Sequence, residues 1–223
     1  MRIELKYLID LPLSNEIYDF CLKNGEIDKF CFNDKSYSIQ SVYKYVWSNK
    51  NKQSKGKIRL RKYTTSANEL FYVEEKFKKN NKTKKNRLKI NKEIFERLYS
   101  CQKYEDFFSL LTDLEFKLSK NSNLKSKKII TKDLRYVRRP LHINFNGHKY
   151  RVTFDSSIKK HFIKTNRLHN VIDKELCILE LKGNSKNITV LQEYLEKNYN
   201  IKPKKISKFR LAKMKYKRLL LKQ

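Results

Sequence analysis

Charged and apolar residues alternate along several short segments of this chain. In Lys57–Arg61 three cations alternate with Ile58 and Leu60. A period of two is that of a β-strand, so the cations share one face and the aliphatic residues the other. The same alternation recurs in residues 1–8, 72–77, 150–155 and 178–182, with Glu75 as an imperfection among the apolar positions of 72–77. Such faces, mixing cations with acids, predict a shared cavity lined by ions.

Two of these segments belong to longer strands, and further strands are expected between the segments, which brings the total to about eight. The extended and the added strands cover residues 36–47, 70–78, 134–145 and 148–158. Asn146-Gly147 predicts a tight hairpin between the last two, because both residues accept positive φ. The lysine-rich stretch Lys78–Lys89 is most simply a solvated loop, but Lys84, Lys85 and Arg87 could equally begin another strand.

Helices are predicted where apolar residues recur at helical spacing. The first covers Asn15–Lys23 with Ser14 as its N-cap, and residues 92–120 form one or two helices that break near Ser100. Another covers Asn187–Asn198. A basic C-terminal helix starts at about Ser207, and its apolar stripe consists of Leu211, Met214, Leu219 and Leu220.

These elements predict an α+β fold, mainly antiparallel β, in one domain over residues 1–223. If the charged faces pointed outward, the amphipathic helices would have little to cover. With the apolar faces outward beneath the helices, the strands can close into an eight-stranded tunnel barrel with a polar, basic lumen. Inward cations are costly when dry, so this lumen must hold water or an anion.

Composition narrows the class of partner that the chain can be expected to bind. The 223 residues are 39% hydrophobic and 13% aromatic, which is enough for a folded core, and the formal charge of +30 favours polyanions. The four cysteines, Cys21, Cys31, Cys101 and Cys177, lack metal-ligand spacing, so reduced thiols are expected rather than zinc. Neither a signal peptide nor a membrane span is visible, which predicts a soluble, cytoplasmic protein. Peripheral association with a membrane stays open, and no particular protein partner is indicated.

The charged faces also supply the candidate chemistry. Arginines provide planar groups that match phosphate oxygens, at Arg59, Arg61, Arg138 and Arg151. Lysines add point charges, at Lys6, Lys76, Lys182 and Lys208. An acid among so many cations is best explained by a divalent ion that bridges carboxylate and phosphate, with Glu180 and Glu4 as the candidate ligands. Positioning, charge neutralisation and a metal are what phosphoryl transfer requires.

Seven short motifs then carry a family resemblance. They are Arg2-x-Glu4-x-Lys6-Tyr7, Lys57-x-Arg59-x-Arg61, Glu74-x-Lys76, Tyr136-x-Arg138, Arg151-x-Thr153-x-Asp155, Leu179-Glu180-x-Lys182 and Ser207-Lys208-Phe209. Their order resembles the VTC domain, the catalytic domain of the vacuolar transporter chaperone polyphosphate polymerases and their bacterial relatives. That family belongs to the triphosphate tunnel metalloenzymes, antiparallel barrels whose lumen binds triphosphate. The resemblance covers residues 2 to about 212.

The resemblance implies an ATP-dependent phosphotransferase that makes polyphosphate with Mn²⁺ or Mg²⁺. The catalytic set would be Arg59, Arg61, Lys76, Arg138, Glu180 and Lys208, with Glu180 as the metal ligand. Further phosphate contacts would come from Lys6, Lys85, Tyr136, Arg151, Lys182, Lys205 and Ser207. Relatives often read Ser-x-Tyr-Phe-Asp-Thr in the second strand, whereas this chain reads Ser41-Val42-Tyr43-Lys44-Tyr45-Val46 and lacks the Asp.

Two other functions stay open. One is a tunnel hydrolase of inorganic triphosphate, thiamine triphosphate or RNA 5′-triphosphate. Hydrolytic relatives carry Glu-x-Glu pairs, but Arg2 and Lys182 each replace one such glutamate here, which counts against strong metal-dependent hydrolysis. The other is a non-enzymatic module that binds nucleic acid or polyphosphate, in a salt-sensitive manner and without a metal. No specific nucleic acid is expected. The hypothesis of a binding module also leaves the acidic side chain among the cations unexplained.

Simpler readings exist for the single residues. Arg59 and Arg61 could form an exposed basic strand, and Glu180 could make a salt bridge to Lys182 or to an arginine. Tyr136 and Tyr43 could pack in the core instead of contacting a substrate.

Overall fold

Antiparallel strands accompany five α-helices in the part of the chain that the structure describes. The structure is a computed structural model, and it describes residues 2–48, 54–79, 82–118 and 129–213. The chain divides into two compact units. The first comprises Met1–Ser38, Thr65–Ala67 and Arg135–Gln223, and the second Ile39–Thr64 and Asn68–Leu134.

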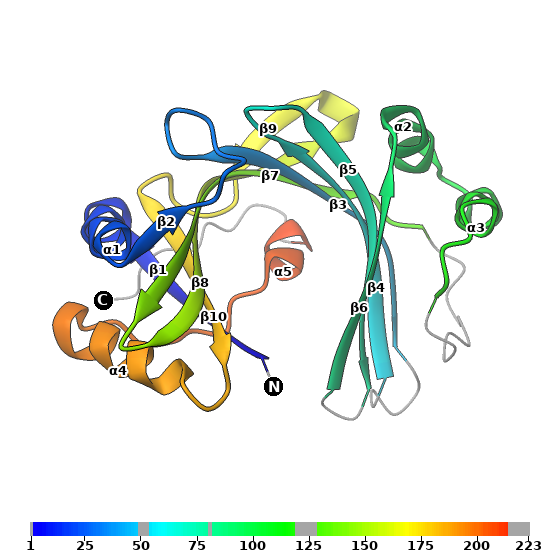
Figure 1. Ribbon diagram of the computed structural model, residues 1–223. Coiled ribbons are helices and arrows are strands. Elements are labelled where there is room, and N and C mark those ends of the chain that lie inside the picture. Colours follow the sequence, from blue (N-terminus) through cyan, green and yellow to red (C-terminus); the bar gives the residue numbers. More distant parts are fainter. Residues whose placement is uncertain (1, 49–53, 80–81, 119–128, 214–223) are drawn as a thin grey trace. The chain divides into compact units, whose positions relative to one another are not determined.

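The first unit is a curved antiparallel sheet with α1 (Leu11–Lys23) and α4 (Ile188–Tyr199) on one face and α5 (Lys208–Lys213) on the other (Figure 1). Its strand order is β1 (Arg2–Asp10), β10 (Leu176–Asn184), β8 (His148–Phe162) and β7 (Lys132–Phe145). The short strands β2 (Gly25–Ile27) and β9 (Arg167–Asn170) pair with β7 and β8. It also contains the short 3₁₀ helix η1 (Ile163–Thr165).

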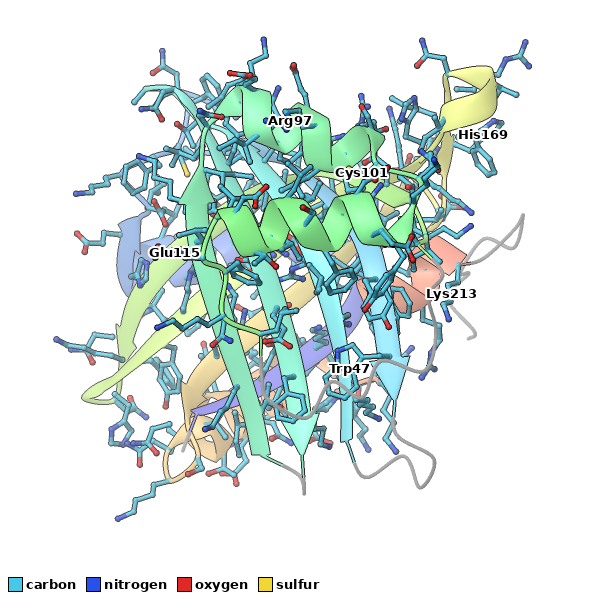
Figure 2. The ribbon with its side chains drawn as sticks, turned by 90° about the vertical axis from the view of Figure 1, so that its right-hand side faces the viewer. Trp47, Arg97, Cys101, Glu115, His169 and Lys213 are labelled. Atoms are coloured by element: carbon cyan, nitrogen blue, oxygen red, sulfur yellow. The ribbon has the colours of Figure 1, made fainter. Side chains whose placement is uncertain are left out.

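The second unit has the strand order β3 (Tyr37–Ser48), β4 (Ser54–Thr64), β5 (Glu69–Lys79) and β6 (Lys82–Ile90). Its helices are α2 (Lys92–Ser100) and α3 (Tyr104–Asp113). Figure 2 shows both helices lying across one face of these strands, with Cys101 between them. Two helices with a break near Ser100 confirm the prediction for residues 92–120.

The apolar strand faces lie beneath the helices in each unit, as predicted. In the first unit Leu179 and Val152 belong to a core cluster that includes Ile17 of α1 and Leu191 of α4. The second unit has an equivalent cluster, built from Ile58, Leu60, Val73, Phe95 and Phe107. This burial supplies the main stabilisation of each unit, and it leaves the opposite face of the strands to the charged residues.

Two local predictions were wrong. The N-cap of α1 is Asp10 and not Ser14, because Asp10 Oδ1 accepts a hydrogen bond from Leu13 N at 2.9 Å. Pro12 favours this earlier start, since its fixed φ suits the first turn of a helix. The solvated-loop reading of Lys78–Lys89 is also wrong, because β6 begins at Lys82 and pairs with β5 along its length.

The predicted hairpin is confirmed, with φ of 49° at Asn146 and 74° at Gly147. The C-terminal helix is confirmed over Lys208–Lys213, whereas Met214, Leu219 and Leu220 of its predicted stripe lie outside the described residues. Closure of eight strands into one barrel concerns both units together and stays a prediction, as does a single domain over residues 1–223. Among the described helices, none is both long and apolar enough to cross a membrane.

Candidate functional site

A buried carboxylate surrounded by cations lies on the charged face of the second unit. Glu74 of β5 is only 1% exposed and stands opposite Arg59 of β4 and Arg87 of β6. Arg59 Nε donates to Glu74 Oε2 at 2.7 Å, and Lys85 Nζ lies 2.5 Å from Oε1. The Nε atoms of Arg87 and Arg61 lie 3.4 and 3.8 Å from the same carboxylate. We call these five residues the Glu74 cluster.

The charges in the Glu74 cluster are unbalanced. Burial alone would raise the pKa of Glu74, but Arg61, Arg59 and Lys85 hold it far below its usual range. The pKa of Lys85 is lowered even though it contacts Glu74, first by burial and also by repulsion from Arg59 and Arg61. One carboxylate therefore does not neutralise four cations, and the cluster favours a further anion.

Two tyrosines extend this cluster along the strands. Arg61 Nη1 donates to Tyr63 Oη at 2.9 Å, and the guanidinium of Arg87 lies 3.5 Å from the ring centre of Tyr72. Burial would raise the pKa of Tyr63, but Arg61 lowers it. Arg87 was not among the predicted site residues. The alternation of Lys85 and Arg87 was the signal that could have identified it, had residues 82–90 been read as a strand.

Lys76 lies beside the Glu74 cluster rather than within it. It is exposed, and it stands opposite Lys57 of β4 and Lys85 of β6. The ammonium of Lys57 lies 5.5 Å from the ring centre of Tyr43, which is buried. The row Lys57, Lys76 and Lys85 thus adds more positive charge to the same strand face.

The first unit carries a different cluster, in which acids and cations are nearly matched. Asp155 of β8 is fully buried and accepts two hydrogen bonds from Arg138, from Nε at 2.6 Å and from Nη2 at 2.8 Å. Lys208 Nζ lies 2.5 Å from Asp155 Oδ2. Burial would raise the pKa of Asp155, but Arg138 and Lys208 lower it. This bidentate pair orients the guanidinium of Arg138 and occupies two of its nitrogens.

The charge of Lys208 is stabilised by two carboxylates, those of Asp155 and Glu180. Burial would lower the pKa of Lys208, but the carboxylates of Asp155 and Glu180 raise it to about 12. Its ammonium lies 5.2 Å from the ring centre of Tyr136, which is buried beneath it. Lys208 is therefore a fixed cation at the start of α5.

Glu180 and Glu4 alternate with two lysines on the neighbouring strands β10 and β1. The register places Glu4 opposite Lys182, and Lys6 opposite Glu180. Lys6 Nζ lies 2.7 Å from Glu4 Oε1 and 3.5 Å from Glu180 Oε2. Lys182 Nζ contacts Glu180 Oε1 and lies 3.6 Å from Glu4 Oε2. The salt bridge between Glu180 and Lys182 that the sequence left open is thus present. We call these four residues, with Asp155, Arg138 and Lys208, the Asp155–Glu180 cluster.

This donor set can hold a divalent cation only with help from a substrate. Among the described residues, no three acidic, histidine or cysteine side chains gather as a metal site. The two neighbouring carboxylates of Glu4 and Glu180 fit the way Mg²⁺ binds in phosphate-handling sites, where phosphates and waters supply the other ligands. Burial would raise the pKa of Glu180, but Lys208, Lys182 and Arg138 hold it far lower, so the carboxylate is ionised.

The remaining predicted residues lie at the margins of this cluster. Arg151 is half-buried, with Nη2 3.5 Å from Tyr37 Oη and 3.8 Å from Asp28 Oδ2. Ser207 Oγ accepts a long hydrogen bond from Arg210 N at the start of α5, and Lys205 is exposed.

Lys44, next to the position where relatives carry Asp, faces the apolar side of the second unit. Its ammonium is fully buried and donates to Tyr99 O and Cys101 O, each at 2.8 Å, and to Thr131 Oγ1 at 2.9 Å. Burial lowers the pKa of Lys44 to about 8. Lys44 therefore ties β3 to the C-terminal end of α2 and to Thr131, and belongs to neither charged cluster.

Comparison with known proteins gives a family and a fold. The VTC domain model matches residues 1–215. No curated protein gives a significant match. HpAC1 from Hippeastrum, described as an adenylyl cyclase candidate with a dominant triphosphatase activity, superposes with a TM-score of 0.57 and 13% identity over 95% of each chain.

Two further solved structures share the fold. The PH1819 protein from Pyrococcus horikoshii OT3 gives a TM-score of 0.50 at 13% identity, over 95% of this chain and 97% of its own. The protein bh2851 from Bacillus halodurans, described as an adenylate cyclase candidate, gives 0.51 at 14% identity, over 94% of this chain and 96% of its own. At these identities the likeness concerns the fold alone.

Proposed function

Since the chain belongs to the VTC domain family of the triphosphate tunnel metalloenzymes, we propose that it is a polyphosphate polymerase that transfers the γ-phosphate of ATP to a growing polyphosphate chain. The observation that carries this proposal is the surplus of cations in the Glu74 cluster, where four cations surround one carboxylate. A triphosphate or a polyphosphate chain supplies the closely spaced negative charges that such a cluster lacks.

Each residue has a defined part in this proposal. Arg59 and Arg61 bind phosphate oxygens of the donor, while Glu74 fixes the direction of Arg59. Arg138, held in place by Asp155, and Lys208 supply cations to the phosphoryl group being transferred. Phosphoryl transfer depends on such positioning and charge stabilisation and requires little covalent chemistry from the protein.

Glu180, with Glu4 beside it, would hold Mn²⁺ or Mg²⁺. When bound, the metal would neutralise charge on the phosphates. Lys6 and Lys182, which contact both carboxylates, would then turn to phosphate oxygens.

A hydrolase of inorganic triphosphate or a related triphosphate is the second candidate. The same cations would hold the triphosphate, and water would replace the chain end as acceptor. The triphosphatase activity described for HpAC1, which shares the fold, supports this alternative.

One assay separates these functions. Purified protein is incubated with ATP and Mn²⁺ or Mg²⁺, chains are resolved on a gel, and ADP and free phosphate are measured. We expect long chains together with ADP. Free phosphate without chains would favour hydrolysis, and neither product would favour a binding module.

The variant Glu180→Gln tests the metal ligand. Metal-dependent turnover should fall at least about 100-fold, while the fold is largely preserved. Glu175→Gln is the matched control, since Glu175 is an exposed glutamate of the same unit. Unchanged turnover in Glu180→Gln would refute its role as metal ligand.

A further inference from the structure

A hollow lies in the first unit, where the β7–β8 hairpin ends the charged face. Its volume is about 410 Å³, which is within the range of small-ligand sites. Side chains of three adjacent strands line it, namely His142 of β7, Lys149 and Arg151 of β8, and Lys182 of β10. We call it the hairpin pocket.

The floor of the hairpin pocket is well ordered by packing. Tyr150 is buried, and its hydroxyl donates to Asn187 O at 2.8 Å. Gly183 allows this arrangement, because a Cβ at that position would come within 2.8 Å of the Tyr150 ring.

The hairpin pocket continues the Asp155–Glu180 cluster. Lys182 belongs to both, since it contacts Glu180 and also lines the pocket. Arg151 stands directly opposite Lys182 in the register of β8 and β10. Lys149 precedes Arg151 by two residues on β8, so strand alternation places both on the same face, about 7 Å apart along the strand.

Cations dominate the lining. None of the described residues that line the pocket is acidic. Acids outside the lining reach three of its side chains: Lys182 contacts Glu180 and lies 3.6 Å from Glu4, and Asp28 lies 3.8 Å from Arg151 and 4.0 Å from His142. Lys149 is exposed and makes no ion pair with any described residue. Lys149 is therefore the least neutralised cation of the hairpin pocket.

We propose that the hairpin pocket binds the polyphosphate chain beyond the phosphates that react, with Lys149 as its outermost cation. This inference rests on the proposed function, and it adds the path that the long polymer takes beyond the reacting phosphates. A linear polyanion can follow the row Lys182, Arg151 and Lys149 without a break. A triphosphate held at Lys6 and Lys182 can be bound by these two cations without Lys149.

The test compares two ligands, tripolyphosphate and a long polyphosphate, in equilibrium binding titrations at several salt concentrations. In Lys149→Gln, affinity for the long chain should fall roughly tenfold, as expected for one charge-assisted contact. Its salt dependence should decrease by about one counterion. Affinity for tripolyphosphate should stay within about twofold. Lys149→Glu should weaken binding of the long polyphosphate further.

Lys174→Gln is the matched control, because Lys174 is an exposed lysine of the same unit that does not line the pocket. An equal loss for both ligands in Lys149→Gln, or a loss no larger than in Lys174→Gln, would overturn the inference and leave the proposed function standing. If the wild type binds neither ligand, the proposed function fails, and the inference fails with it.

Discussion

The Glu74 cluster and the Asp155–Glu180 cluster share the same strand period but differ in their ratio of charges. Around Glu74, four cations face one buried carboxylate, and two of them, Lys85 and Arg87, are about 40% exposed. Around Asp155, both cationic partners are nearly as buried as the acid itself. Exposed surplus cations can exchange a carboxylate for a phosphate, whereas a buried matched pair is part of the fold. The second unit thus carries the unneutralised charge on which the proposed phosphate binding rests, whereas in the first unit Asp155 holds Arg138 and Lys208 in place.

Removing the buried acid of the first unit should have the largest effect. Asp155→Asn leaves Arg138 and Lys208 buried without a full counter-charge, so it should lower the free energy of unfolding by about 3–5 kcal/mol. Urea denaturation measures this loss. Glu175→Gln, at an exposed site, should change stability by less than about 0.5 kcal/mol. A loss below about 1 kcal/mol in Asp155→Asn would contradict the structural role of this pair.

Glu74→Gln should lower the free energy of unfolding by less, about 2 kcal/mol, because Lys85 and Arg87 can turn to water. Added tripolyphosphate should recover more of this loss than in Asp155→Asn, since phosphate can take the place of the carboxylate. Thermal unfolding with and without tripolyphosphate measures the difference. Equal recovery in both variants would show that the two clusters do not differ in this way.

The same variant has a pH signature. The pKa of Glu74 is lower in the folded chain than the unfolded value of about 4.3. Its ionised form therefore stabilises the fold fully above about pH 5, and this contribution is lost as the pH falls below about 4. Glu74→Gln should flatten the acid limb of a stability–pH curve. A limb as steep as that of the wild type would exclude this linkage.

Lys44 gives the smallest effect, and here the neutral form of the side chain, not the charged form, stabilises the fold. It is a buried cation held by neutral oxygens, and its pKa of about 8 lies below the unfolded value of about 10.4. Between these values the unfolded chain binds more protons, so stability rises with pH. From pH 8 to 10 the wild type should gain about 1–2 kcal/mol relative to Lys44→Met. Parallel curves for both proteins would refute the lowered pKa.

Local chemistry accounts for the parts of the fold that the sequence predicted correctly. Alternation over Lys57–Arg61 and 178–182 identified charged strand faces, and Asn146-Gly147 identified the hairpin. The helical spacing of 92–120 was equally readable. Each of these signals depends only on residues that are a few positions apart in the sequence. The signal for the N-cap of α1 at Asp10 was also local. Ser14 was a competing N-cap candidate, however, and only the observed hydrogen bond decides between the two residues.

The sequence by itself determined which residues share a strand face, because the period of a strand is set by its own backbone. Only the tertiary structure decided which acid each cation meets. Arg138 and Lys208 converge on Asp155 from 17 and 53 residues away, and Glu74 collects its partners from two neighbouring strands. Such contacts depend on register and chain crossing, which no local pattern specifies. The charged residues of the strand faces could thus be identified as a set, but their division into a surplus cluster and a matched cluster could not.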